Sequence, residues 1–372
     1  MGEIEVQYSE GSELNLHGEF KNCSKNPNHL NFIPIDQFKL EHLPEKYRND
    51  DIFEFINLTA QLTVRVVCTY VSKKRPPTWP GTSLKYLFSD MRGEEMNSTG
   101  TGRVWVVTLA EEGGGNEESD DELYQDGKEY HEGPDNGAEQ EAAHEAREEM
   151  GQINTCVCEN CKESDSPSSE FGWVKVITAR HVVFNNKEAR SASCRLFFDS
   201  DRGGNPKTIL TVVKMATLNP KLDWCWLKCV TCDKGLLERL SEMCKRRHEL
   251  YLKINGDFEK FRDVAKNNPE IRVSRNLNVI VSHPHGCSKQ VSVGEWTLAT
   301  QYKDNLDDVW TRYFYTTATC KGSSGATTIM LGYTGTDDHV HSGFYTKLKL
   351  NHSGLGDDYW EPKVQEKIFV GV

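Results

Sequence analysis

The chain has 372 residues, of which 37% are hydrophobic, with 8 Trp and 15 Phe. This is enough apolar material to bury two cores, which excludes a chain that is disordered or fibrous throughout. The formal net charge is −12, but residues 111–149 alone hold 16 acidic residues against Lys128 and Arg147. The rest of the chain is therefore nearly neutral, and we expect no nucleic-acid partner.

The N-terminus carries no recognisable targeting signal. Residues 1–6 have neither a basic start nor an apolar run, and no apolar stretch approaches the ~20 residues that span a bilayer. We therefore expect a cytoplasmic protein without a membrane partner. In such a reducing compartment the 12 Cys are expected to be free thiols or metal ligands rather than disulfides.

The first strands are predicted after a polar N-terminal stretch. Residues 1–55 show no clear period, and their role is left open. Residues 62–70 and 103–107 are rich in β-branched side chains, which is typical of strands, and Gly100-Thr101-Gly102 forms a turn that opens the second.

A strongly acidic stretch interrupts this pattern. From residue 111 to about 135 the Gly, Glu and Asp content cannot support a core, so we expect disorder, followed by a short helix over 139–150. The cysteine-rich run Cys156-Val157-Cys158-Glu159-Asn160-Cys161 comes next, and a Ser/Pro spacer follows it.

The second half of the chain contains two groups of strands with a helix between them. Leu236, Leu240, Met243 and Leu250 share one face of a helix that continues to about residue 266. Because short strands on both sides of one helix suggest two closed sheets, we expect a mostly β protein built from two barrels. The predicted strands cover residues 173–179, 195–198, 209–215, 223–228, 277–282 and 290–294.

Three side chains suited to acyl transfer stand at the ends of these predicted strands. Ser324 lies in Gly322-Ser323-Ser324-Gly325, a composition that also occurs in ordinary loops. A serine nucleophile needs a base, and the base needs a carboxylate that fixes its tautomer. His181 and Asp223 precede Ser324 in the order His, Asp, Ser, one of three chain orders common among such triads, whereas each alone could be an ordinary strand-end or turn residue.

The strings around these residues resemble trypsin-like serine proteases, in particular the HtrA/Deg branch without a PDZ domain. Thr178-Ala179-Arg180-His181 is similar to the family's T-A-x-H, and residues 223–228 are similar to D-x-A-x-L-K with Cys for Ala. Residues 322–325 are similar to G-[DN]-S-G, and residues 280–294 resemble a hairpin of the second barrel. The resemblance implies two six-stranded antiparallel β-barrels of the chymotrypsin-like fold, joined by the helical connection and interrupted by the disordered acidic insertion.

The resemblance also implies roles for these residues. Ser324 would be the nucleophile, His181 the general base and then acid, and Asp223 the orienting carboxylate. The backbone N–H groups of Gly322 and Ser324 would form the oxyanion hole. Ser323 stands where zymogen-activated members have Asp, so activation through a newly freed N-terminus is not expected. The implied partner is a protein or peptide substrate, and no cofactor is required for catalysis.

The resemblance extends to specificity. Ala318, six residues before the nucleophile, would form the base of the pocket and leaves no carboxylate for Lys or Arg. Thr319 and the stretch containing His341 and Gly343 resemble glutamyl endopeptidases and viral chymotrypsin-like proteases, in which a hydroxyl and a histidine bind Glu or Gln. We therefore expect cleavage after Glu or Gln, the alternative being that His341 only packs within the barrel.

Five cysteines have the spacing of metal ligands. Cys156, Cys158 and Cys161, together with Cys229 and Cys232, suit a tetrahedral structural zinc. Free thiols are the alternative, because five sulfurs compete for four positions. Cys287 and Cys320 are expected to pack inside a barrel.

Two other functions remain open at this stage: a catalytically silent, protease-like interaction protein and a zinc-organised binding module. The expected organisation has seven parts. These are an N-terminal accessory segment (1–55), the opening strands of the first barrel (56–110), the acidic insertion with its helix and cysteines (111–170), the remainder of the first barrel (171–233), the helical connection (234–268), the second barrel (269–350) and a C-terminal segment (351–372).

Overall fold

The structure is a computed structural model. It describes residues 3–9, 18–79, 83–109, 155–201, 208–217, 223–265, 276–303, 309–331 and 339–357. The predicted disorder at 111–135 and the predicted helix over 139–150 lie outside these residues. Within them, no helix is long and apolar enough to cross a membrane.

The first barrel consists of six antiparallel strands. In spatial order they run β5-β4-β7-β8-β9-β6, and pairing of β6 with β5 closes the ring. Their alternate side chains fill the interior, with Val64, Val176 and Leu227 fully buried. The strands are β4 (Thr63–Tyr70), β5 (Glu95–Leu109), β6 (Gly172–Thr178), β7 (Ala192–Arg195), β8 (Ile209–Ala216) and β9 (Cys225–Thr231).

The second barrel also has six strands, in the order β14-β15-β12-β11-β10-β13. A single bridge between Thr327 and Val340 joins the start of β13 to the start of β14 and closes it. The strands are β10 (Leu277–Ser282), β11 (Gln290–Lys303), β12 (Val309–Tyr315), β13 (Thr328–Leu331), β14 (His341–Tyr345) and β15 (Leu350–Ser353). Short strands β3 (Ile33–Pro34) and β16 (Gly356–Asp357) add to β11 and β12.

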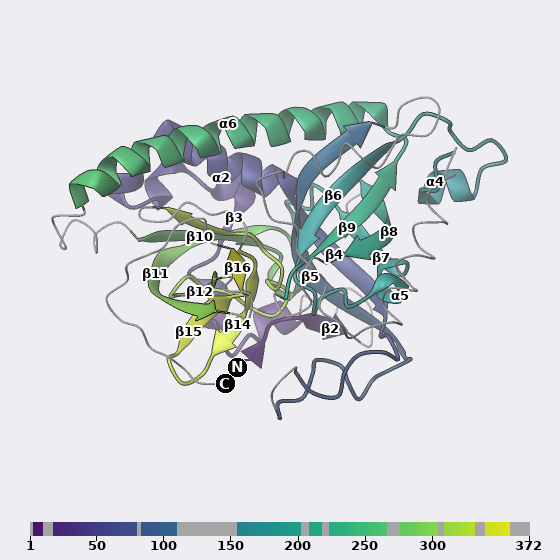
Figure 1. Cartoon of the computed structure of the whole chain (residues 1–372), viewed down its shortest axis with the longest axis horizontal. Helices are drawn as coiled ribbons and strands as arrows, with labels where there is room; N and C mark the ends of the chain where they lie inside the picture. The colour runs from purple at the N-terminus through teal and green to yellow at the C-terminus, as the bar shows by residue number, and fades with distance from the viewer. Residues whose placement is uncertain are drawn as a thin grey trace.

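Two helices cover the junction of the barrels. Figure 1 shows the long helix α6 (Lys234–Ala265) running across both, with α2 (Asp50–Leu62) beside it. The first turns of α6 insert Leu237 and Leu240 into the core of the first barrel. Leu250 and Ile254, further along α6, pack with α2 and β10 in a separate apolar cluster. The helical connection therefore contributes to the core of the first barrel and to the apolar cluster between α2 and β10 of the second.

The N-terminal residues belong to both sheets. Strand β1 (Glu3–Ile4) pairs with β14 of the second barrel, and β2 (Gln7–Ser9) pairs with β5 of the first. Residues 3–9 thus run in an extended conformation from one barrel to the other. The remaining short elements are η1 (Pro27–His29), η2 (Ile35–Gln37), η3 (Leu40–His42), η4 (Glu45–Tyr47), α4 (Glu159–Lys162), α5 (Asn186–Ala189) and η9 (Pro284–Gly286).

The predicted fold class is confirmed, but four local predictions are wrong. The turn predicted at residues 100–102 lies inside strand β5, where these residues pair with β4. Leu62, predicted to begin a strand, ends the helix α2, which the sequence analysis missed because α2 runs into β4 without a Gly or Pro break. The strand predicted at 195–198 lies at Ala192–Arg195, and Phe197 leaves it with a φ of 57°. Asp223 precedes its strand, which begins at Cys225.

Candidate active site

His181 and Asp223 meet at the end of one strand pair. Strands β6 and β9 pair with Thr178 opposite Cys225, so the residues just beyond these positions are neighbours. The His181 Nδ1 atom lies 2.8 Å from Asp223 Oδ2 and 2.9 Å from Oδ1, and the His181 backbone N–H donates to Oδ1 at 3.2 Å. The carboxylate therefore holds the proton on Nδ1 and leaves Nε2 as the basic atom.

Ser342 supports this carboxylate from the second barrel. Its hydroxyl donates to Asp223 Oδ2 at 2.8 Å. Burial alone would raise the pKa of Asp223, but the adjacent His181 and the hydrogen bonds from His181 and Ser342 hold it below its ordinary value. Asp223 is thus an ionised group suited to stabilising an imidazolium. The sequence analysis did not identify Ser342.

Ser324 stands on a turn that only glycines allow. Gly322 and Gly325 have φ values of 93° and 87°, and a Cβ atom on Gly325 would lie 2.2 Å from the Thr101 carbonyl oxygen. The Ser324 hydroxyl donates to the Ser342 carbonyl oxygen at 3.2 Å. His181 Nε2 is buried and has no hydrogen-bond partner among the described residues. Ser342 therefore contacts both Asp223 and Ser324, but the Ser324 hydroxyl does not bond to the imidazole.

A carbonyl group from the N-terminal segment sits against this turn. The Glu5 carbonyl oxygen accepts from the Gly322 N–H at 2.7 Å and from the Ser324 N–H at 3.4 Å. Two backbone donors that converge on one oxygen beside a serine are what an oxyanion hole requires. The structure therefore brings a peptide carbonyl, two donors and Ser324 together.

The Glu5 side chain occupies the place expected for a substrate side chain. Its Oε2 atom lies 2.7 Å from His341 Nε2 and 2.6 Å from the Thr319 hydroxyl, while Lys25 binds Oε1. Burial alone would raise the pKa of Glu5, but the His341 hydrogen bond and the Lys25 charge lower it to about 2 from an ordinary 4.5. The carboxylate is therefore ionised and fully partnered.

Tyr315 determines how His341 presents its proton. Its hydroxyl lies 2.7 Å from His341 Nδ1, and burial raises the pKa of Tyr315, so this hydroxyl stays protonated and donates. Burial likewise lowers the pKa of His341, which favours the neutral ring. With Nδ1 accepting, the remaining proton is on Nε2 and points at Glu5. His341 Nε2 thus acts as a donor toward the Glu5 carboxylate.

Lys25 and Asn351 complete the pocket, and the sequence analysis identified neither. Lys25 donates to Thr319 Oγ1 at 3.1 Å and to Asn351 Oδ1 at 2.8 Å. Lys25 and Glu5 lie in a polar segment without a period, and about 300 residues separate them from Thr319 along the chain. No local pattern could have joined them.

The other two predicted pocket residues have different surroundings. Gly343 pairs with Ile4, and a Cβ atom on it would lie 2.2 Å from the Glu3 carbonyl oxygen, so only glycine lets β1 approach β14. Ala318 lies in a small apolar cluster with Phe32 and Cys320. Gly343 therefore acts through the backbone.

A buried ion pair supports the segment that carries His181. Arg75 Nε and Nη2 each lie 2.7 Å from a carboxylate oxygen of Glu188, and both side chains are at most 1% exposed. The backbone N–H groups of Ser72 and Phe184 also donate to Glu188, and Arg75 donates to the His181 carbonyl oxygen at 3.1 Å. The loop that follows β4 and the loop that follows His181 are thus bound to each other.

Four of the five predicted metal-ligand cysteines come together. The Sγ atoms of Cys156, Cys158, Cys161 and Cys232 all lie within 4.8 Å of one another, with 3.7 Å between Cys158 and Cys232. Sulfur atoms bound at 2.3 Å to one tetrahedral zinc lie about 3.7 Å apart, so these four could hold a metal ion. The prediction was wrong for Cys229, which points into the first barrel, 3.9 Å from Cys194 Sγ. Cys229 lies within β9, on its inward face, whereas Cys232 lies beyond the strand.

Known proteins of similar structure share little sequence with this chain. No family model matches the chain. No curated protein matches it either. It is similar to an HtrA-type protease, AlgWS227A with decapeptide, at 12% identity and a TM-score of 0.35, over 81% of this chain and 62% of that one. It is also similar to the active form of the Rv3671c protease from M. tuberculosis (12% identity, TM-score 0.32, 81% and 78% covered) and to Deg5 (9%, 0.34, 84% and 90%).

The chain spans less than two thirds of the length of AlgWS227A. The geometry of the site itself is therefore the basis for inferring a function.

Proposed function

We propose that the protein is a serine endopeptidase that hydrolyses peptide bonds through His181, Asp223 and Ser324, by way of an acyl-enzyme. The observation that carries this proposal is the position of Glu5. Its carbonyl oxygen accepts from the Gly322 and Ser324 N–H groups, and its side chain is bound by His341 and Thr319. One residue thus occupies both the oxyanion hole and the specificity pocket, as the residue before a scissile bond would.

The chemistry follows from these positions. The Ser324 hydroxyl leaves the Ser342 carbonyl, transfers its proton to His181 Nε2 and attacks the substrate carbonyl carbon. Asp223 stabilises the resulting imidazolium, and the two N–H groups stabilise the oxyanion, a contribution of about 3 kcal/mol for each donor. His181 then protonates the leaving amine. A water molecule, which gives a proton to His181, then attacks the ester carbonyl. The acyl group leaves Ser324, which takes its proton back from His181.

The pocket supports a preference for Glu or Gln. The His341 Nε2–H and the Thr319 hydroxyl can each donate to a carboxylate or an amide oxygen. The Lys25 ammonium adds a positive charge, which favours Glu over Gln. An apolar side chain would leave these three donors without acceptors.

Labelling with a fluorophosphonate probe tests the proposal. We expect the probe to modify Ser324 in the full chain and in the Glu5→Ala variant, where the pocket holds the N-terminal segment less tightly, and not at all in His181→Ala. Circular dichroism serves as the control that checks whether the His181 variant is folded. Absence of labelling in the full chain and in Glu5→Ala alike would contradict the proposal.

A catalytically silent interaction protein is the second candidate. It is favoured by one observation: Ser324 donates to Ser342 and not to His181, while residues 3–9 fill the site. In that case these residues would be a permanent part of the fold. The same labelling experiment separates the two candidates, because a silent protein stays unlabelled even when Glu5 is replaced.

We further infer that Cys156, Cys158, Cys161 and Cys232 bind a structural zinc. The cluster lies beside the outer face of β9, with Phe171 and Val230, and contains no group that the proposed hydrolysis uses. Zinc there would connect the segment before β6 to the end of β9. Its removal should lower stability and leave the chemistry of Ser324 unchanged.

A further inference from the structure

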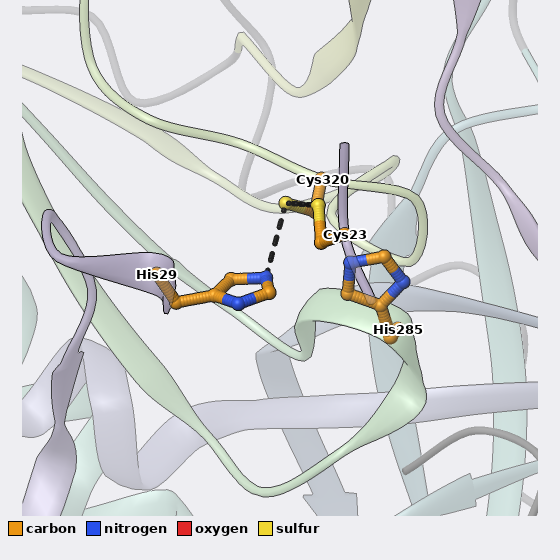
Figure 2. Close-up of side chains that lie close together, drawn as sticks. All are labelled: Cys23, His29, His285 and Cys320. Atoms are coloured by element: carbon orange, nitrogen blue, oxygen red, sulfur yellow. Dashed lines mark hydrogen bonds between the residues drawn. The ribbon is translucent and has the colours of Figure 1, made fainter. Parts of the chain in front are cut away.

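A second cluster of metal-binding side chains lies next to the turn that carries Ser324. Cys23, His29, His285 and Cys320 each offer one ligand atom, and these atoms all lie within 4.8 Å of one another. Figure 2 shows the two imidazole rings on either side of the two sulfur atoms. The Cys23 and Cys320 Sγ atoms are 3.5 Å apart, and His29 Nε2 is 3.5 Å from Cys320 Sγ. Ligands of one tetrahedral zinc are separated by about 3.4 to 3.7 Å, so the spacing fits.

The surroundings of His285 prepare it as a ligand. Its Nδ1 atom lies 3.1 Å from Gln7 Oε1, an oxygen that can only accept, so the proton is on Nδ1. The Nε2 atom then carries a lone pair, and it is buried without a hydrogen-bond partner among the described residues. A metal-binding histidine usually donates its other ring N–H to an acceptor in this manner.

The two sulfur atoms accept hydrogen bonds as metal thiolates do. The Asn26 backbone N–H donates to Cys23 Sγ at 3.4 Å, and the Asn26 side chain donates to Cys320 Sγ at 3.1 Å. Phe20 stacks on the His29 ring with 3.8 Å between centroids, which fixes its orientation. Two thiolates and two neutral imidazoles are a common donor set for zinc.

We propose that Cys23, His29, His285 and Cys320 form a structural zinc site. It joins the N-terminal segment, the turn after β10 and the loop that leads to Ser324, which lies four residues after Cys320 in sequence. Lys25 lies between the ligands Cys23 and His29, so the same ion would position the ammonium group that binds Glu5. Zinc here stabilises the specificity pocket without contacting the reacting atoms.

Metal analysis of the purified full chain tests this site. We expect two zinc ions per chain, one of them lost in Cys23→Ser and the other in Cys158→Ser. Cys244→Ser, which changes a half-buried cysteine outside both clusters, serves as the matched control and should keep two. Because a variant can misfold, zinc released from the unaltered chain by a thiol-blocking mercurial is counted as well.

Other outcomes overturn the site. A single zinc ion per chain, lost only in Cys158→Ser, would show that the second cluster binds none. An intact mass lower by two hydrogens, with Cys23 and Cys320 linked in a peptide map, would show a disulfide instead. Unchanged zinc content in a folded Cys23→Ser protein would refute the proposal directly.

The position of residues 3–9 carries a second inference, which rests on the proposed function. Glu5 is followed by Val6, which is buried, and then by β2, which pairs with β5. The chain therefore continues past Ser324 on the leaving-group side. Strands β1 and β2 hold it on both sides of the Glu5–Val6 bond, and Glu5 is held in the pocket between them.

We propose that Ser324 cleaves the Glu5–Val6 bond of its own chain. Ser324 Oγ forms an ester with the Glu5 carbonyl carbon, the C–N bond breaks, and His181 transfers the serine proton to the Val6 amine. Water then hydrolyses the ester, which leaves a carboxylate on Glu5 and restores Ser324. This differs from zymogen activation, because Ser323 offers no carboxylate to the new amino group.

Cleavage would open the pocket to other substrates. While the bond is intact, the tethered segment competes at an effective concentration on the order of millimolar. Afterwards residues up to Glu5 are held only by the two-residue strand β1 and the pocket, and they can dissociate. The part from Val6 onward stays attached through β2 and through the hydrogen bond between Gln7 and His285.

Mass spectrometry and N-terminal sequencing of the purified full chain test self-cleavage. We expect the chain to begin at Val6, and the Ser324→Ala and Glu5→Lys variants to remain intact. Glu3→Lys is the matched control: Glu3 is an exposed acidic residue of the same segment, so this variant should be cleaved like the unaltered chain.

Three outcomes would overturn this proposal. An intact chain whose Ser324 nevertheless reacts with the fluorophosphonate probe, and which cleaves a separate Glu-containing peptide, refutes self-cleavage and leaves the proposed function standing. An intact chain that neither reacts with the probe nor cleaves peptides refutes both. Cleavage after Glu5 in Ser324→Ala would assign the cut to another protease.

Discussion

Replacing Glu188 by Gln should destabilise the protein strongly, because Glu188 neutralises a guanidinium that has no access to solvent. Glu188 accepts four hydrogen bonds, two of them from Arg75, and both side chains are at most 1% exposed. Removing one partner of a buried pair costs about 3–5 kcal/mol. A typical domain has only about 5–15 kcal/mol of stability in total. We therefore expect Glu188→Gln to lose a large fraction of the free energy of unfolding.

A double-mutant cycle in urea measures this directly. Arg75→Met should cost about as much as Glu188→Gln, since it leaves the carboxylate uncompensated. The double variant should lose at least about 2 kcal/mol less than the sum of the two, because no unpaired charge is left in the interior. Glu54→Gln, which removes the partner of Arg246 in an exposed pair of the same bidentate geometry, should have a much smaller effect.

Additive single losses, or a loss of less than about 1 kcal/mol for Glu188→Gln, would refute this prediction. The cycle has a functional readout as well. Since Arg75 also binds the His181 carbonyl oxygen, both single variants should slow fluorophosphonate labelling of Ser324 at temperatures where they remain folded.

Three further outcomes are expected at the pocket. His341→Leu should reduce kcat/KM for a Glu-containing peptide roughly 10- to 100-fold, because a hydrogen bond to a charged group is lost. The same variant should leave kcat/KM for a Leu-containing peptide almost unchanged. Equal losses for the two peptides would contradict the proposed role of His341 in the pocket. Tyr315→Phe should lower the ratio of kcat/KM for the Glu-containing peptide to that for the Leu-containing peptide, because the ring of His341 can then carry its proton on Nδ1 and turn a lone pair toward the carboxylate. An unchanged ratio would show that Tyr315 does not set the tautomer. In a Ser324→Ala background, ionised Glu5 stabilises the fold above pH 4.5, and this stabilisation is lost as the pH falls toward 2. The loss of free energy of unfolding between pH 5 and pH 3 should be about 2 kcal/mol. Urea unfolding of Glu5→Gln in the same background at both pH values should lack this difference.

The sequence alone predicted the elements that have local signatures. The strands and the long helix follow from periods of two and of about 3.6, which are local properties. The strings around His181, Asp223 and Ser324 are equally local, which is why the sequence alone suggests that these residues share one site.

What could not be predicted depends on contacts between distant parts of the chain. Glu5 and Lys25 join Thr319 and His341 across roughly 300 residues, and Cys23 joins Cys320 in the same way. Cys229 lies within β9 and faces the barrel interior, whereas Cys232 lies beyond the strand, and this difference depends on strand register and on where the strand ends. The helix α2 was missed because its amphipathic period ends at Leu62, directly before the alternating residues of β4.

The placement of α6 has a consequence for how the molecule comes apart. Leu237 and Leu240 are part of one barrel's core, while Leu250 and Ile254 are part of the cluster under the other. Arg247, between these two pairs, donates to the Thr59 hydroxyl of α2 at 2.9 Å. If one barrel unfolds, apolar side chains of α6 become exposed to solvent, and the other barrel packs against the same helix. The two halves should therefore unfold together in a single cooperative transition, and the contact between them should be rigid rather than a hinge.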